Sequence, residues 1–123
     1  MSHIVVIRTQ VKDATAVHNA CKRLGLPEPV QGTTKLFDGE VTGLAVQLPG
    51  WVYPVVANLA SGELHYDNFQ GRWGNEQNLA KFLQMYAVCR ATLEARRCGH
   101  SVTEQTLADG SIKLTINVQG GAV

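Results

Sequence analysis

The chain has 123 residues, of which 45% are hydrophobic and 17% are charged, and its formal net charge is +1 at pH 7. This length predicts a single domain over residues 1–123 that buries a core without disulfides or metal. The balanced charge leaves no overall electrostatic footprint for nucleic acid or for an anionic membrane. No apolar run reaches the length of a membrane span and the start has no signal-peptide layout, so the default expectation is a cytoplasmic location.

A strand and a helix are expected first along the chain. Residues 3–10 predict a strand, and its run Ile4-Val5-Val6-Ile7 is continuously apolar, which is typical of a strand that is central in a sheet or covered on both faces. A helix should then begin after Asp13 as its N-cap and end at Leu24, with Gly25 as the residue that closes it. Two prolines follow shortly afterwards and prevent its continuation.

Residues 31–67 show no helical pattern and instead predict a meander of up to four short strands separated by turns. The expected strands cover residues 33–37, 40–48, 51–59 and 63–67. Pro54 indicates either an edge position or the first ladder residue for the third of these strands, because proline cannot donate to a ladder.

The longest helical pattern in the chain runs from Glu76 to Cys98, with Asn75 as N-cap and Gly99 just past its end. Six apolar residues fall within one arc of this helix and predict its core face. They are Leu79, Phe82, Leu83, Tyr86, Cys89 and Leu93. Arg90 projects into the middle of this stripe, where it either extends to the rim of the sheet or marks a site as a buried, paired arginine.

The far face of the same helix carries small, weakly polar residues, which is unusual for a face in full contact with water. They are Ala80, Gln84, Val88, Ala91 and Ala95. One interpretation is simply the high helix propensity of alanine. The other is a second packing surface, an interface for another copy or another chain.

After the helix, residues 101–107 and 111–118 predict two strands joined by the turn Ala108-Asp109-Gly110. The stretch 118–123 reads as a frayed tail. The order of elements predicts an α+β fold with two helices on one face of a largely antiparallel sheet, a ferredoxin-like variant with extra strands.

The loop over residues 67–74 is the strongest candidate for a ligand site. Phe69 and Trp73 can stack a base or a flat ligand, and Arg72 can meet an anion. His65 and Asp67 share strand parity and can therefore point to the same face, as a general acid–base pair requires. The alternative is that both rings plug the end of the core and that the glycines serve turn geometry.

The cysteines and histidines show no spacing typical of a metal site, so no metal and no cofactor are expected. Cys21 and Cys89 lie on helical core stripes and are interpreted as buried small hydrophobes. Cys98 lies beside positive charge at a helix end, which leaves a reactive thiol open as an alternative.

Several short motifs, spread over nearly the whole chain, resemble one protein family. They are the opening Met1-Ser2-His3, Leu24-Gly25, the helical run Phe82-Leu83-Gln84-x-Tyr86-Ala87 and the closing Asp109-Gly110-Ser111-Ile112-Lys113-Leu114. Through them the chain resembles a family of short proteins of unknown function from bacteria, cyanobacteria and algal plastids, the hypothetical chloroplast reading frame thirty-five family. The family has no established activity, so the resemblance implies no catalytic residue. It implies a partner role beside other small proteins or ring-forming ATPases.

Three classes of function stay open on the sequence alone. The favoured one is a non-catalytic protein-binding or assembly module, as a homo-oligomer or with another small protein, because a meander implies open sheet edges. The second is a small-ligand-binding protein or an enzyme that uses the 65–74 loop. The third is a single-stranded nucleic-acid binder, which the balanced charge and the lack of an RNP-type aromatic run disfavour.

Overall fold

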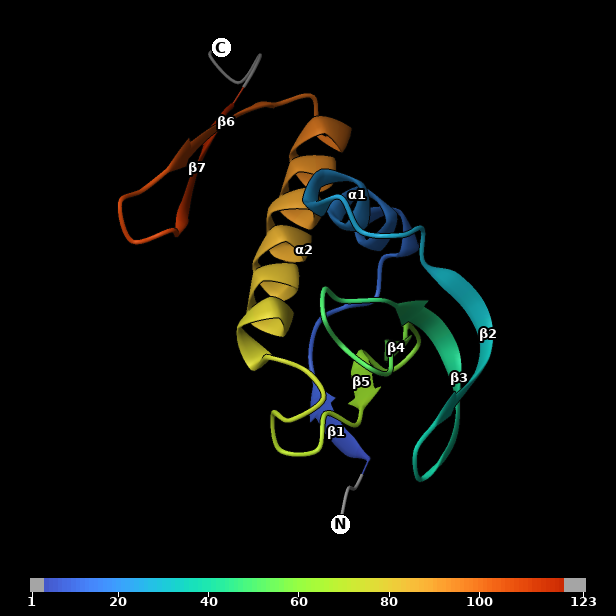
Figure 1. The fold of residues 1–123 in the computed structure, drawn as a ribbon. Helices are drawn as coiled ribbons and strands as arrows, with labels where there is room; N and C mark the ends of the chain where they lie inside the picture. The colour runs from blue at the N-terminus through green and yellow to red at the C-terminus, as the bar shows by residue number, and fades with distance from the viewer. Residues whose placement is uncertain (1–3, 119–123) are drawn as a thin grey trace.

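The computed structural model describes residues 4–118 and shows an α+β fold, as predicted (Figure 1). The elements in chain order are β1 (Val5–Arg8), α1 (Ala14–Leu24), β2 (Val30–Leu36), β3 (Gly39–Val46), β4 (Val55–Asn58), β5 (Glu63–Tyr66), α2 (Glu76–Arg97), β6 (Ser101–Thr106) and β7 (Ile112–Asn117). His3 and residues 119–123, which the sequence assigned to the first strand and to a tail, lie outside the described residues.

Strands β1 to β5 form one antiparallel sheet in the order β1-β5-β4-β3-β2, and β6 pairs only with β7 in a separate two-stranded sheet. The structure corrects the expectation that the first strand is central or covered on both faces. β1 is an edge strand, and Val5 and Val6 are 37% and 48% exposed. β4 lies in the middle of the sheet instead, and Pro54 directly precedes its first residue, so no ladder hydrogen bond is lost.

Both helices begin and end with the caps that the sequence predicts. The Asp13 carboxylate accepts from the Ala16 N–H at 3.2 Å, and the Asn75 side chain accepts from the Gln77 N–H at 2.8 Å. Gly25 closes α1 with a φ of 71°, a left-handed conformation that glycine adopts at little cost. These local bonds satisfy backbone groups that a helix end would otherwise leave unpaired.

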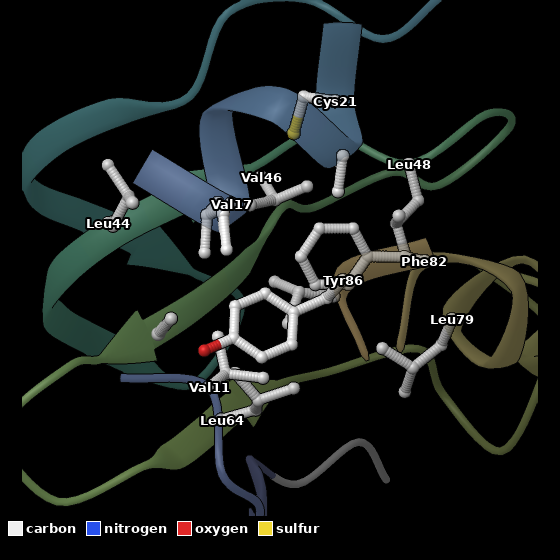
Figure 2. Close-up of a cluster of buried hydrophobic side chains, with 14 of the residues drawn as sticks. Val11, Val17, Cys21, Leu44, Val46, Leu48, Leu64, Leu79, Phe82 and Tyr86 are labelled. Atoms are coloured by element: carbon white, nitrogen blue, oxygen red, sulfur yellow. The ribbon is translucent and has the colours of Figure 1, made fainter. Parts of the chain in front are cut away.

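The main core lies where α1 and α2 pack against the sheet. Figure 2 shows side chains from both helices and from the strands converging around the rings of Phe82 and Tyr86. Phe82 is fully buried, and Leu64 on β5 is also fully buried beneath the helices. All six residues of the predicted core stripe of α2 belong to this cluster, Leu83 and Leu93 at its margin. The core-facing prediction for α2 is therefore confirmed.

The β6–β7 hairpin leaves the end of α2 and folds back along that helix (Figure 1). Two contacts hold it there. The Gln84 side-chain amide donates to the Gly110 carbonyl at 3.1 Å, and the Arg23 guanidinium on α1 donates two hydrogen bonds of 2.8 Å to the Glu104 carboxylate on β6. The hairpin thus touches both helices without joining the main sheet.

We expect Glu104→Gln to destabilise the fold by about 0.5 kcal/mol at pH 7, because the pair with Arg23 is partly exposed and screened by solvent. The hydrogen bonds from Arg23 hold the pKa of Glu104 below its ordinary value. Since the folded-state pKa is the lower one, this stabilisation is present above the unfolded-state pKa and is lost as the pH falls through the folded-state value. Urea unfolding curves of the two proteins should therefore differ at neutral pH and coincide in strong acid. A difference that is the same at both pH values would contradict this reason.

Candidate functional site

The outer edge of β1 carries backbone hydrogen-bonding groups that no other strand uses. The Thr9 N–H donates to the Gly62 carbonyl at 2.9 Å, so the residues that follow β1 and precede β5 still form a hydrogen-bonded pair. Bonded and non-bonded pairs alternate along an antiparallel ladder, and the register therefore turns the N–H and C=O groups of Val6 and Arg8 away from β5. Within residues 4–118 no strand lies on that side of β1.

A groove of about 660 Å³ lies between residues 8–12, which continue from β1, and the side of α2. Its wall on α2 includes Leu83, Ala87 and Ala91, and this wall is largely apolar. The volume is within the range of clefts that take up small molecules or several side chains of a peptide. An exposed, apolar edge strand is also a template for pairing with another chain. The edge and the groove therefore form one continuous candidate site.

Tyr86 fixes the segment that forms the other wall of the groove. Its hydroxyl oxygen accepts from the backbone N–H groups of Lys12 at 3.0 Å and Asp13 at 3.1 Å. The same hydroxyl donates to the Gln10 carbonyl at 3.0 Å. Three backbone groups of the β1–α1 connection thus converge on one side chain of α2, and this hydroxyl group ties the two walls of the groove together.

Two of the four charged residues that line the groove, Arg90 and Glu94, are paired with one another at one end of it, whereas Arg8 and Lys12 form no ion pair among residues 4–118. The Arg90 guanidinium lies 3.0 Å from the Glu94 carboxylate and 3.7 Å from that of Asp13. The hydrogen bond to Glu94 raises the pKa of Arg90 further above its ordinary value. The Arg90 side chain is 42% exposed and lies at the edge of the groove. It is therefore not the buried, paired arginine that one of the two sequence interpretations described. The apolar part of the groove is its wall on α2, whereas the facing segment 8–12 contributes mostly polar residues.

The loop over residues 67–74 brings three of its predicted ligand residues together. The rings of Phe69 and Trp73 meet edge to face at 4.7 Å, and the Arg72 guanidinium lies over the Phe69 ring at 5.1 Å. Phe37 from the β2–β3 turn and Tyr53 add further rings at 5.3 and 5.8 Å from Trp73. The rings pack against one another around Trp73, but neither Phe69 nor Trp73 belongs to the main core cluster, and Phe37 is 59% exposed. They therefore form a separate, partly exposed aromatic cluster rather than a plug at the end of the core.

The other two predicted ligand residues, His65 and Asp67, do not form a pair. Asp67 is 1% exposed, and one of its carboxylate oxygens accepts from the Phe69 N–H at 3.1 Å. That bond supports a turn in which Phe69 and Gln70 adopt left-handed φ values of 48° and 54°. Among residues 4–118 no hydrogen bond or ion pair joins His65 to Asp67. One oxygen of the Asp67 carboxylate therefore supports the loop, and a side chain as buried as this one does not reach a substrate beside His65 in this conformation.

The five residues predicted as an interface on α2 have three different environments. Val88 and Ala95 are only 4% and 5% exposed, with β6 and β7 against the helix, and Gln84 bonds to the turn of the same hairpin. The structure thus corrects the expectation for these three, because the chain itself covers that part of the face. Ala91 lines the groove, and Ala80 is exposed.

The thiols of Cys21 and Cys89 are buried, as predicted, and burial raises their pKa, to about 11 for Cys21. Cys98 is exposed at the end of α2.

Within the described part of the chain, no three histidine, cysteine or acidic side chains lie close enough to hold a metal ion. Over the same residues, neither helix has the length and apolar character needed to cross a membrane.

Comparison of the chain with protein-family models, with curated proteins and with solved structures found no match in any of the three. The family resemblance drawn from the sequence motifs therefore stays a prediction. The function has to be argued from the geometry of the chain itself.

Proposed function

We propose that this protein is a non-catalytic protein-binding module that takes an extended segment of a partner protein as an additional strand on β1. The observation that carries the proposal is the row of outward backbone groups at Val6 and Arg8 beside the groove on α2. Main-chain hydrogen bonds to a sheet edge supply affinity in this mode of recognition, and pockets for alternate side chains supply specificity.

The groove indicates the chemistry of the bound segment. Alternate side chains of an added strand point to one face, and here that face is toward Leu83, Ala87 and Ala91. Burial of apolar surface against this wall is favourable, and a charged side chain that faces these three residues would lose its hydration. Arg8 and Lys12 line the groove on its other side and form no ion pair among residues 4–118, so a charged side chain of the partner segment fits only there, and only if it is acidic. The partner segment should therefore be extended and carry apolar residues at every second position.

The first test uses Val6→Pro. Proline removes the outward N–H of residue 6, which bonds to nothing inside the sheet, so the fold should persist while the bond to the partner strand is lost. The probe is a short peptide selected from a random peptide display library on the immobilised wild-type protein. Its affinity should fall about tenfold or more in Val6→Pro, as the loss of one backbone hydrogen bond and of strand alignment implies. Val6→Thr, which keeps the N–H, is the matched control and should bind normally.

A second pair of variants tests the groove. Ala91→Glu places a charge in the apolar wall and should weaken the same peptide strongly, whereas Ala80→Glu on the exposed part of α2 should not. Amide hydrogen exchange should show Val6 and Arg8 becoming protected when the peptide binds. Failure to select any peptide, or equal binding by all four variants, would contradict the proposal. If the wild type self-associates and Val6→Pro is a monomer, the partner strand is that of a second copy.

A further inference from the structure

A second, smaller cavity of about 250 Å³ lies on the other side of α2, between α1, α2 and β6. It shares no residue with the groove beside β1. Basic side chains from the last turns of both helices, Lys22 and Arg23 from α1 and Arg96 from α2, line it. Glu104 of β6 closes one side.

The charges in this cavity do not cancel. Arg23 and Glu104 neutralise each other through their two hydrogen bonds. No carboxylate of residues 4–118 forms an ion pair with Lys22 or Arg96. Burial raises the pKa of the Cys89 thiol, so this group adds no negative charge at neutral pH. Lys22 and Arg96 thus form no ion pair among residues 4–118, and the cavity carries an excess of positive charge, although Arg96 is close enough to Glu104 to help lower the pKa of that carboxyl.

One residue that lines the same cavity carries a buried hydroxyl group without a hydrogen-bond partner among residues 4–118. Thr92 Oγ1 is shielded from solvent and makes no hydrogen bond within the described chain, although a threonine in a helix commonly bonds to the carbonyl one turn earlier. Buried polar groups are nearly always hydrogen-bonded, and an exception calls for a ligand or a water molecule. The Asn19 side chain lines the cavity as well and can donate from its amide.

We propose that this cavity binds a phosphate group, that of a small phosphorylated metabolite or free inorganic phosphate. Lys22 and Arg96 match its two negative charges, and Asn19 supplies a further donor to its oxygen atoms. The Thr92 hydroxyl, covered in this conformation, joins them by rotating about χ1 into the cavity. Leu93 and Cys89 offer an apolar wall for the carbon part of an organic phosphate. This inference is independent of strand addition at β1.

The basic residues also suit the C-terminal ends of the helix dipoles, and the test must separate that role from ligand binding. Arg97 provides the control, because it lies in the same last turn as Arg96 but is bonded to Glu94 at 3.1 Å outside the cavity. Arg96→Gln and Arg97→Gln remove the same charge from the same helix end. Only the first removes a cavity side chain.

Calorimetric titration with inorganic phosphate and with phenyl phosphate, at ionic strength matched by sodium chloride, measures the binding. We expect saturable binding in the wild type. Its affinity should fall about tenfold in Arg96→Gln and in Lys22→Gln, because each loses one charge-assisted hydrogen bond. In Arg97→Gln the affinity should stay within about twofold of the wild-type value. Thr92→Val, which keeps the side-chain shape, should weaken it several-fold. Tighter binding of phenyl phosphate than of phosphate would identify an organic phosphate as the ligand, and equal binding would identify the free ion. No saturable binding of either probe, or equal losses in Arg96→Gln and Arg97→Gln, would overturn the proposal.

Discussion

Replacing Gly74 with alanine is expected to destabilise the protein by about 3 kcal/mol. A Cβ atom at this position would lie 2.3, 2.6 and 2.7 Å from three ring atoms of Trp51. The ring has no room to retreat, because it is 5% exposed, packs edge to face on Tyr66 at 5.6 Å and donates from its indole N–H to the Asn75 carbonyl at 3.0 Å. Urea unfolding followed by tryptophan fluorescence would measure the change.

Gly71→Ala is the matched control in the same loop. An added Cβ there would meet nothing within 4 Å, and the cost is limited to the positive φ of 93°, about 1 kcal/mol. Both substitutions reduce the freedom of the unfolded chain equally, so this effect cancels between them, and Gly74→Ala should cost about 2 kcal/mol more than Gly71→Ala because of the clash with Trp51. Equal destabilisation by the two variants would show that Trp51 can move and that the packing argument is wrong.

Tyr86→Phe is expected to cost about 2–3 kcal/mol and to weaken peptide binding at the groove. The substitution keeps the buried ring but leaves two backbone N–H groups and one carbonyl of residues 10–13 without their partner. Removing one side of a hydrogen bond is costly because the remaining groups have already lost their hydration. The segment that forms one wall of the groove should then loosen, and its amide hydrogens should exchange faster.

Tyr53→Phe is the matched control, because it also removes a tyrosine hydroxyl group, but from a half-buried ring whose hydroxyl makes no hydrogen bond within residues 4–118. It should change the free energy of unfolding by less than about 0.5 kcal/mol. A loss of stability in Tyr86→Phe as small as this, or unchanged exchange of the Lys12 and Asp13 amides, would show that the hydroxyl does not hold the segment.

The two helices and their ends could be predicted from sequence because their determinants are local. Asp13, Gly25 and Asn75 act on backbone groups within a few residues of themselves, and the core face of α2 follows from the helical period alone. The turn around Gly110, with a φ of 88°, is local in the same way. Such features do not depend on which distant segment packs nearby.

The place of β1 in the sheet could not be predicted, because strand order is set by pairing between distant residues. A run of apolar residues fits a central strand, and it fits an edge strand equally well if that edge pairs with a strand of another molecule. The far face of α2 was ambiguous for a related reason. Val88 and Ala95 look like residues of an interface, and they are in one, but the surface that covers them belongs to the hairpin of the same chain.

The candidate groove was also beyond sequence analysis, although open sheet edges were expected. Its two walls are joined by the Tyr86 hydroxyl and backbone groups 73 to 76 residues away, and no spacing rule connects such positions. For the 67–74 loop, the sequence identified residues that lie close together, but it did not predict that the rings of Phe69 and Trp73 pack edge to face.

The pairing of β1 with β5 has a consequence for the order in which the protein folds. Strands β2 to β5 are consecutive hairpins that close over short loops, whereas the Thr9 contact to Gly62 spans 53 residues and the Lys12 contact to Tyr86 spans 74. Contacts over long loops form late because closing the loop costs chain entropy before any interaction is gained. β1 should therefore dock after the β2–β5 hairpins have formed, and it should also detach before they open in partial unfolding. A protein that adds its own strand to β1 would bind only molecules in which this docking is complete, so its apparent affinity would report the population of that final state.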